Sequence, residues 1–126
     1  MTHELSKQFR FDSAHTLNRE IQTDSSRRIH GHSYRAEVVI RGTPEVPSGM
    51  IMDLGAFERA LTETRDSLDH RFLDEINDLG PATMENLTSW IWGRLSPALP
   101  GLTRVTVYRD SAGESCTYHG PSGDSR

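Results

Sequence analysis

Apolar and polar residues alternate in two segments near the start of the chain, residues 5–15 and 34–41, as they do in half-buried β-strands. Between them lies a polar stretch from Thr16 to Ile29, which is longer than a hairpin connection needs and of a length that commonly carries function. The predicted inward-facing side chains are Leu5, Phe9 and Phe11 in the first segment and Tyr34, Ala36, Val38 and Ile40 in the second.

Two segments in the middle of the chain repeat apolar residues at the spacing of amphipathic helices. Asp53 and Thr83 precede these segments, and both residue types are favourable N-caps. Gly80 and Pro81 separate the two predicted helices, and Pro97 ends the second. The predicted apolar positions are Leu54, Phe57, Leu61, Thr64 and Leu68 in the first helix and Leu87, Trp90, Ile91 and Leu95 in the second.

A third strand is predicted around residues 105–107 and a fourth around residues 116–118. The order strand, strand, helix, helix, strand, strand is typical of an α+β fold, here a four-stranded antiparallel sheet with two helices on one face. Such a sheet leaves two open edges, which favours pairing between subunits. We expect residues 1–120 to form a single domain and residues 121–126 to be a flexible C-terminal tail.

The composition excludes several classes of protein. The chain has 126 residues and a formal net charge of −4, which argues against a nucleic-acid-binding module. No window approaches the roughly 18–20 consecutive apolar residues of a membrane span, and the first ten residues lack the apolar region of a secretory signal, so we expect a cytoplasmic protein. Glycine and the apolar residues other than tyrosine make up about 40% of the chain, a low share that favours a homo-oligomer.

Six histidines and a single cysteine restrict any metal site to mainly histidine and carboxylate ligands. His15 continues the inward parity of the first strand, and His30 and His32 continue that of the second. If the strands pair, the three imidazoles meet at one end of the core, and three neutral imidazoles with an open fourth position are a known catalytic zinc arrangement. The spacing alone leaves both a metal site and three structural histidines open.

Asp69 and His70 follow the first predicted helix. A carboxylate beside an imidazole can orient the ring and keep it basic for proton transfer. A histidine at the end of a helix is also stabilised by the helix dipole, and the local sequence by itself favours this structural interpretation.

Five motifs lie in order between about residues 9 and 120. They read FDSAHTL at 11–17, HGHSY at 30–34, GMIMDL at 49–54, LDHRFL at 68–73, and PATMENL at 81–87 followed by WIW at 90–92. Together they resemble the motifs of the 6-pyruvoyl-tetrahydropterin synthase and 6-carboxy-tetrahydropterin synthase family. The resemblance implies the tunnelling fold, in which a four-stranded antiparallel sheet with two helices is closed into a barrel by oligomerisation, commonly as a homohexameric dimer of trimers.

The resemblance also implies a site. Zinc is held by His15, His30 and His32, and the substrate of the family, dihydroneopterin triphosphate, is bound between subunits. Family members use a cysteine base assisted by an Asp-His pair, which Asp69 and His70 match, so the resemblance reverses the local preference for a structural role. In the motif that precedes the second helix, Thr83 and Glu85 are then candidate substrate-binding residues.

The chain departs from the family at the base. The family cysteine lies four residues before the HGH motif, where this chain has Ser26. An isolated hydroxyl is a poorer base than a thiolate, so Ser26 does not simply inherit the role. Asp24 is a candidate replacement base, with a solvated loop residue as the alternative interpretation. The only cysteine, Cys116, is far along the chain and is interpreted as a small buried residue.

A second departure concerns the glutamate with which family members bind the pterin near the end of the third strand. This chain has Arg109 there. Asp110 could serve if the strand end is shifted by one residue, and Glu114 is a poorer alternative.

The sequence therefore predicts a zinc-dependent lyase acting on a dihydropterin in pterin or queuosine biosynthesis, most similar to 6-carboxy-tetrahydropterin synthase. Two alternatives stay open. One is a divergent enzyme that cleaves a dihydropterin side chain by retro-aldol chemistry. The other is a catalytically weak, zinc-containing paralogue that binds a pterin or purine.

Overall fold

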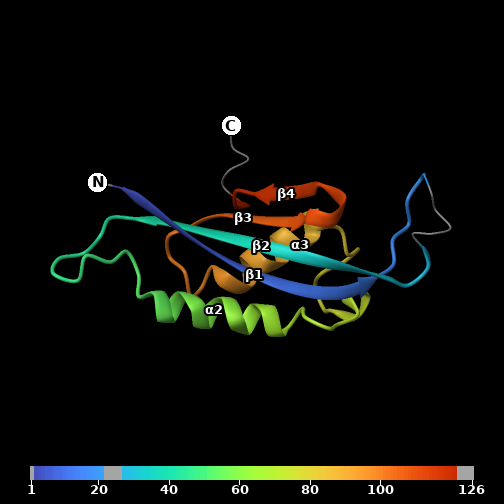
Figure 1. Cartoon of the computed structure of the whole chain (residues 1–126), viewed down its shortest axis with the longest axis horizontal. Coiled ribbons are helices and arrows are strands. Elements are labelled where there is room, and N and C mark those ends of the chain that lie inside the picture. Colours follow the sequence, from blue (N-terminus) through green and yellow to red (C-terminus); the bar gives the residue numbers. More distant parts are fainter. Residues whose placement is uncertain (1, 22–26, 122–126) are drawn as a thin grey trace.

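The two alternating segments form long neighbouring strands, β1 (His3–His15) and β2 (His30–Gly42). They pair antiparallel over their whole length, so that His15 lies directly opposite His30. The computed structural model describes residues 2–21 and 27–121 (Figure 1). Ser26, Asp24 and residues 122–126 of the predicted tail lie outside the described residues.

The remaining strands extend the sheet from the other side of β2. Strand β3 (Leu102–Arg109) pairs antiparallel with β2, and β4 (Glu114–Tyr118) pairs antiparallel with β3, which gives the order β1-β2-β3-β4. A short 3₁₀ turn, η2 (Asp110–Ala112), and Gly113 connect β3 to β4. Gly113 has φ 68°, a left-handed conformation that glycine adopts without steric cost. The predicted four-stranded antiparallel sheet is confirmed.

Both predicted helices form, and both begin where the sequence predicts. Helix α2 (Leu54–Asp66) is capped by Asp53, whose carboxylate accepts a hydrogen bond from the Gly55 amide at 2.6 Å. Helix α3 (Met84–Leu95) is capped by the Thr83 hydroxyl, which accepts from the amide of Asn86 at 3.1 Å. Each cap satisfies an amide that has no partner within its helix.

The core lies between the helices and one face of the sheet. The inward parity of β1, β2 and β3 supplies one side, and the buried stripes of α2 and α3 supply the other, so both helices cover the same face, as predicted. A 3₁₀ turn, η1 (Leu73–Glu75), closes one end of the core through Leu73. Among the described residues, the longest helices are too short and too polar for a membrane crossing. Core side chains include Phe9, Phe11, Val38, Phe57, Leu61, Leu87, Ile91, Val105 and Val107.

One predicted core position is wrong. Leu54 fits the helical stripe but is 58% exposed, because it is the first residue of α2 and lies beyond the part of the helix that packs on the sheet. It lines an apolar groove with Leu5 and Met50 instead. At the other end of the stripe, Leu68 is fully buried although the helix has already ended at Asp66.

Candidate metal centre and active site

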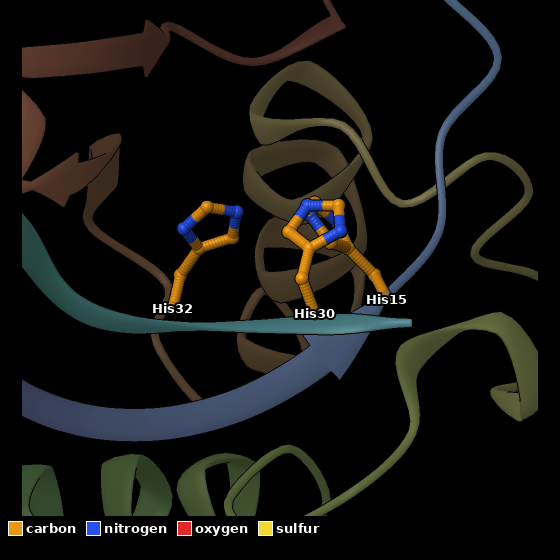
Figure 2. A group of neighbouring side chains, drawn as sticks. All are labelled: His15, His30 and His32. Carbon is orange, nitrogen blue, oxygen red and sulfur yellow. Dashed lines mark hydrogen bonds between the residues drawn. The ribbon is translucent and has the colours of Figure 1, made fainter. Parts of the chain in front are cut away.

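The three predicted metal ligands converge on the helix-covered face, at the end of the core. His15 is the last residue of β1, and His30 and His32 are the first and third residues of β2. Figure 2 shows the three rings on the same side of the two strands. One ligand nitrogen from each ring lies within 4.8 Å of the others. Strand alternation, together with the register of His15 opposite His30, produces this arrangement.

Hydrogen bonds fix which nitrogen of each ring carries a proton. The Nδ1 atoms of His15 and His30 lie 2.8 Å from the carbonyl oxygens of Ala82 and Arg28, respectively. A carbonyl only accepts, so both Nδ1 atoms are protonated and donate, and in the neutral rings the Nε2 lone pairs are free. These two Nε2 atoms face each other at 3.0 Å.

The third ring presents its Nε2 atom in the same way. Nη1 of Arg109 lies 3.1 Å from Nε2 of His32, and because a guanidinium can only donate, this nitrogen is also unprotonated. Three unprotonated nitrogens thus gather in one place. Two acceptors 3.0 Å apart with no proton between them repel each other, whereas a bound cation would satisfy both.

Burial favours the neutral form of two of these imidazoles, His15 and His32. Desolvation is the main cause that lowers the pKa of His32 to about 4, and the neighbouring Arg109 guanidinium lowers it further. Desolvation also lowers the pKa of His15, although the hydrogen bond to Ala82 opposes the shift. Near pH 7 both rings are therefore in the neutral form that binds a metal ion.

The geometry of the cluster suits a small divalent cation. Tetrahedral zinc with nitrogen ligands at roughly 2.0–2.1 Å places those nitrogens about 3.3 Å apart. In this chain one pair is 3.0 Å apart and all lie within 4.8 Å, so small side-chain movements would complete the coordination. The carbonyls of Ala82 and Arg28 supply the outer hydrogen bonds that metal-binding histidines usually make. The residues present fit a zinc ion.

A cavity of about 190 Å³ opens beside His15, between the start of α3, the end of β3 and the start of β4. Thr83 and Glu85, the predicted substrate-binding residues, both line it. Thr83 also caps α3, so its hydroxyl oxygen is shared with the helix. The other lining residues are Leu17, Arg19, Tyr34, Ala82, Met84, Arg109 and Glu114.

Asp110, a predicted substrate-binding residue, does not line this cavity. Arg109 keeps the inward parity of Val107 and lines the cavity, so Asp110 falls outside it. Both Asp110 carboxylate oxygens accept hydrogen bonds from Arg35, at 2.9 and 3.0 Å, and this pairing holds the pKa of Asp110 below its usual value. Glu114, the poorer alternative in the sequence, is the carboxylate that reaches the cavity, where it pairs with Arg109.

Asp69 and His70 form a contact along the edge of β1 that does not pair with β2, outside the three-histidine cluster. The Asp69 carboxylate lies 2.9 Å from Nδ1 of His70, 3.0 Å from a guanidinium nitrogen of Arg65 and 2.9 Å from the amide of Asp12. The Asp12 amide and then His70 lower the pKa of Asp69. Because His70 is 79% exposed and Nδ1 faces Asp69, its Nε2 atom is accessible to a proton-exchanging group.

Sequence reasoning missed the groups that hold the cluster in place. The orienting carbonyls of Ala82 and Arg28 belong to the backbone, so no side-chain pattern could reveal them. Asp74 was also missed. Its carboxylate accepts hydrogen bonds from the amide and hydroxyl of Thr16, the residue after His15, and so anchors the start of the loop. The candidate bases Ser26 and Asp24 lie outside the described residues.

Comparisons with known proteins agree with this architecture. The family model described as 6-pyruvoyl tetrahydropterin synthase matches residues 4–121. The chain is 33% identical over 117 residues to the 6-carboxy-5,6,7,8-tetrahydropterin synthase of Synechocystis sp., which covers 88% of this chain and 85% of that protein. The solved Caenorhabditis elegans 6-pyruvoyl tetrahydropterin synthase has a TM-score of 0.81 at 25% identity, over 95% of this chain and 96% of that one.

A more distant solved structure shares the fold. It is a Plasmodium vivax 6-pyruvoyltetrahydropterin synthase in which a catalytic glutamate is replaced by cysteine, with a TM-score of 0.72 at 17% identity, over 95% of this chain and 99% of that one. These structures confirm the predicted tunnelling fold of the single chain. Because the family model spans almost the whole chain, from the start of β1 to beyond β4, the protein belongs to the 6-pyruvoyl tetrahydropterin synthase family.

Proposed function

We propose that this chain is a zinc-dependent lyase that acts on a dihydropterin such as dihydroneopterin triphosphate, in the manner of 6-carboxy-tetrahydropterin synthase. The observation that carries the proposal is the convergence of three unprotonated imidazole nitrogens beside a cavity. The Synechocystis relative, which aligns over most of both chains, supports the 6-carboxy reaction in pterin or queuosine biosynthesis.

The described residues divide into three roles. His15, His30 and His32 would hold the zinc ion, which supplies Lewis-acid polarisation of ligand hydroxyl groups when bound. Thr83 and Glu85 line the cavity and bind the substrate. These two residues stand at the start of α3, so the helix fixes their positions relative to His15 through the Ala82 carbonyl.

Proton transfer falls to His70, oriented by Asp69. Nδ1 of His70 faces the carboxylate, which orients the ring and leaves Nε2 to exchange a proton with substrate. Ser26 orients the substrate, and Asp24 is the candidate base in place of the family cysteine. The P. vivax enzyme shows that this fold can use a carboxylate as a catalytic residue, which supports a role for Asp24.

We infer that the working enzyme is a homohexamer with sites between subunits, located in the cytoplasm and without a nucleic-acid partner. The cluster lies on the helix-covered face, whereas Asp69 and His70 lie on the edge of β1, so one chain does not bring them together. Edge pairing with a neighbouring subunit would close the sheet into a barrel and supply the missing half of each site.

A retro-aldol enzyme that shortens the side chain of a dihydropterin is the second candidate. It is favoured by Arg109, which brings a cation into the cavity at the position where the family resemblance places a pterin-binding glutamate. It also requires no cysteine base, in agreement with Ser26.

Product analysis tests the proposal. The zinc-loaded full chain is incubated separately with dihydroneopterin triphosphate and with dihydroneopterin, and products are identified by mass spectrometry, with a zinc-free His15→Ala variant as control. A 6-carboxy product from the first compound alone supports the lyase. Side-chain loss from dihydroneopterin supports the retro-aldol enzyme. Tight binding without turnover of either supports a binding protein and contradicts both enzymes.

The base is tested by a gain-of-function variant. Ser26→Cys restores the residue type that the family resemblance expects, so a synthase that already works without cysteine should gain little. If Ser26→Cys created an activity that the unmodified chain lacks, the assignment of this chain to that reaction would be wrong. If an Asp24→Asn variant keeps full turnover, Asp24 is not the catalytic base.

A further inference from the structure

We propose that Arg109 makes this site selective for ligands that carry an oxyanion, a carboxylate or a phosphate, next to the three histidines. The inference rests on the proposed metal centre and adds the class of ligand that the centre takes. It makes Arg109 a specificity-determining residue.

The position of Arg109 at the end of β3 places its side chain in the lining of the cavity. Arg109 is the last residue of β3, and its side chain points to the same face as the core residues of that strand. It lies opposite Glu114 of β4, and its Nη1 atom is 3.1 Å from Nε2 of His32 on β2. Its side chain is only 17% exposed. A guanidinium placed this deep has given up most of its hydration, so it gains much from an anionic partner.

The hydrogen-bonding capacity of Arg109 is only partly used, by His32, Glu114 and a side-chain hydrogen bond with Tyr34. A guanidinium has five N–H groups. Within the described residues, Nη1 contacts His32, Nη2 pairs with Glu114, and the buried Nε atom has no partner. Glu114 is 46% exposed, so it is a solvated counter-ion that can exchange its partner.

Metal binding would free a further donor. The lone pair on Nε2 of His32 that now accepts from Arg109 is the one that a metal ion would use. One lone pair cannot serve both, so Nη1 of Arg109 loses its acceptor when the cluster is loaded. The guanidinium then stands beside the loaded cluster with one carboxylate partner, and a ligand oxygen is the natural replacement.

The charge of the cavity also favours an anionic ligand. Its lining contains Arg19 and Arg109 against Glu85 and Glu114, so the formal charges of the protein groups cancel. A divalent cation on the neutral histidines adds two positive charges that no lining group balances. Arg19 is exposed and Arg109 is not, so the charge excess is least screened between Arg109 and the metal centre. An oxyanion bound there would balance it.

Binding of matched pterins tests the inference. Calorimetry on the zinc-loaded full chain compares pterin-6-carboxylate with 6-hydroxymethylpterin, which has the same ring but no anionic group, and inorganic phosphate is added as a competitor. We expect the carboxylate to bind at least about tenfold more tightly than the hydroxymethyl compound. In Arg109→Gln the preference should fall to within about twofold. Arg59→Gln, an exposed arginine of α2, is the matched control and should keep it.

The result has clear readings. Competition by phosphate in the unmodified chain but not in Arg109→Gln shows that any oxyanion is recognised; a carboxylate preference without phosphate competition narrows the class to carboxylates. Equal binding of both pterins by the unmodified chain, or a preference that survives in Arg109→Gln, overturns the inference. Zinc content and thermal unfolding check that the variant folds, and Arg109→Lys, which keeps the charge but not the planar fork, should retain an intermediate preference.

These outcomes are independent of turnover. A chain that binds carboxylates through Arg109 but releases no product would contradict the proposed lyase and leave the inference intact. If the chain makes the 6-carboxy product and its ligand preference does not change when Arg109 is replaced, the proposed lyase is supported and the inference about Arg109 is contradicted.

Discussion

Two groups of titratable side chains lie near the same end of β1 but in opposite environments. The three-histidine cluster is on the helix-covered face; backbone carbonyls hold two of its rings, and Arg109 contacts the third. The Asp69–His70 pair is on the free edge of the strand, in an ionic network with Arg65, and its imidazole is largely exposed. One chain supplies all three histidines of the cluster. The Asp69–His70 pair instead leaves Nε2 of His70 accessible to a group outside the chain.

The difference follows from the geometry of a single strand. Side chains of odd-numbered residues in β1 point into the core, which delivers His15 to the cluster. The backbone of Asp12 faces the free edge, where its amide donates to Asp69 and its carbonyl accepts from the amide of His70. One strand therefore contributes His15 to the three-histidine cluster through a side chain and positions the solvent-facing Asp69–His70 pair through its backbone.

Removing a ligand from the buried group should have the largest effect. In His15→Ala we expect zinc affinity to fall by more than about 100-fold, since even outer hydrogen-bond partners of metal ligands are worth about 10–100-fold. Turnover should fall to background, and the unpaired Ala82 carbonyl should cost about 1–3 kcal/mol of unfolding free energy. Chelator competition measures the affinity, and the exposed His119→Ala is the matched control. Unchanged zinc content in His15→Ala would contradict the proposed zinc site at the three histidines.

Removing the exposed imidazole should separate activity from metal binding. His70 has φ 59°, a left-handed conformation that asparagine tolerates, so His70→Asn keeps the backbone while deleting the ring. We expect turnover to fall by at least about 100-fold, a typical contribution of general acid-base catalysis. Zinc content and thermal unfolding should not change. A parallel loss of zinc would show that the two groups are not separate.

Mixing the two inactive variants tests whether the groups work across a subunit boundary. If each site takes its cluster from one copy and His70 from a neighbour, random co-assembly of equal amounts of His15→Ala and His70→Asn leaves about one quarter of the sites intact. Turnover of co-expressed and co-purified protein should therefore recover to about a quarter of the unmodified value. If each site lies within one chain, no mixture recovers activity.

The same contrast explains which parts of the site the sequence could predict. Alternation with a period of two is a local property, so the order of residues along each strand is enough to place His15, His30 and His32 on one face. The helix caps are equally local, because Asp53 and Thr83 bond to amides only two or three residues away. Strand parity and capping therefore predict the sheet, both helices and the convergence of the three histidines, whereas their role as metal ligands rests on the family resemblance.

Features that depend on distant contacts were not predictable in this way. The position of Asp69 on the edge of β1 depends on a hydrogen bond to Asp12, 57 residues earlier in the chain. Asp110 was a candidate for binding the substrate if the strand end were shifted by one residue, but Arg109 takes the inward position and Asp110 pairs with Arg35 outside the cavity. Leu54 matched the helical stripe, but periodicity does not reveal how far a helix extends beyond its sheet.

Neutralising Asp69 should give a smaller effect that depends on pH. Asp69→Asn keeps an acceptor for the Asp12 amide but loses the charge that pairs with Arg65 and His70, so we expect a loss of about 1 kcal/mol in unfolding free energy. The pKa of Asp69 is lowered in the folded chain, so its contribution is fully present above the ordinary pKa of 3.8 and is lost as pH falls through the lower folded value. Denaturation curves of the two proteins should differ by a constant amount between about pH 5 and 8 and converge below about pH 4. A difference that persists at low pH would assign the effect to packing rather than charge.

The smallest effect is expected at Asp110, on the side of the sheet away from the cavity. Its pairing with Arg35 is solvent-exposed, and exposed ion pairs contribute little to stability because water and salt screen them. Asp110→Asn should therefore leave zinc content, ligand binding and turnover unchanged and alter thermal unfolding only slightly, with the difference vanishing in high salt.

Glu114→Gln is the informative counterpart, since this carboxylate pairs with Arg109 inside the cavity and its loss should change pterin affinity. If Asp110→Asn abolished pterin binding while Glu114→Gln did not, the carboxylate that binds the ligand would be the one on the outer face. The substrate would then lie on the face of the sheet that the helices do not cover, rather than beside the three histidines.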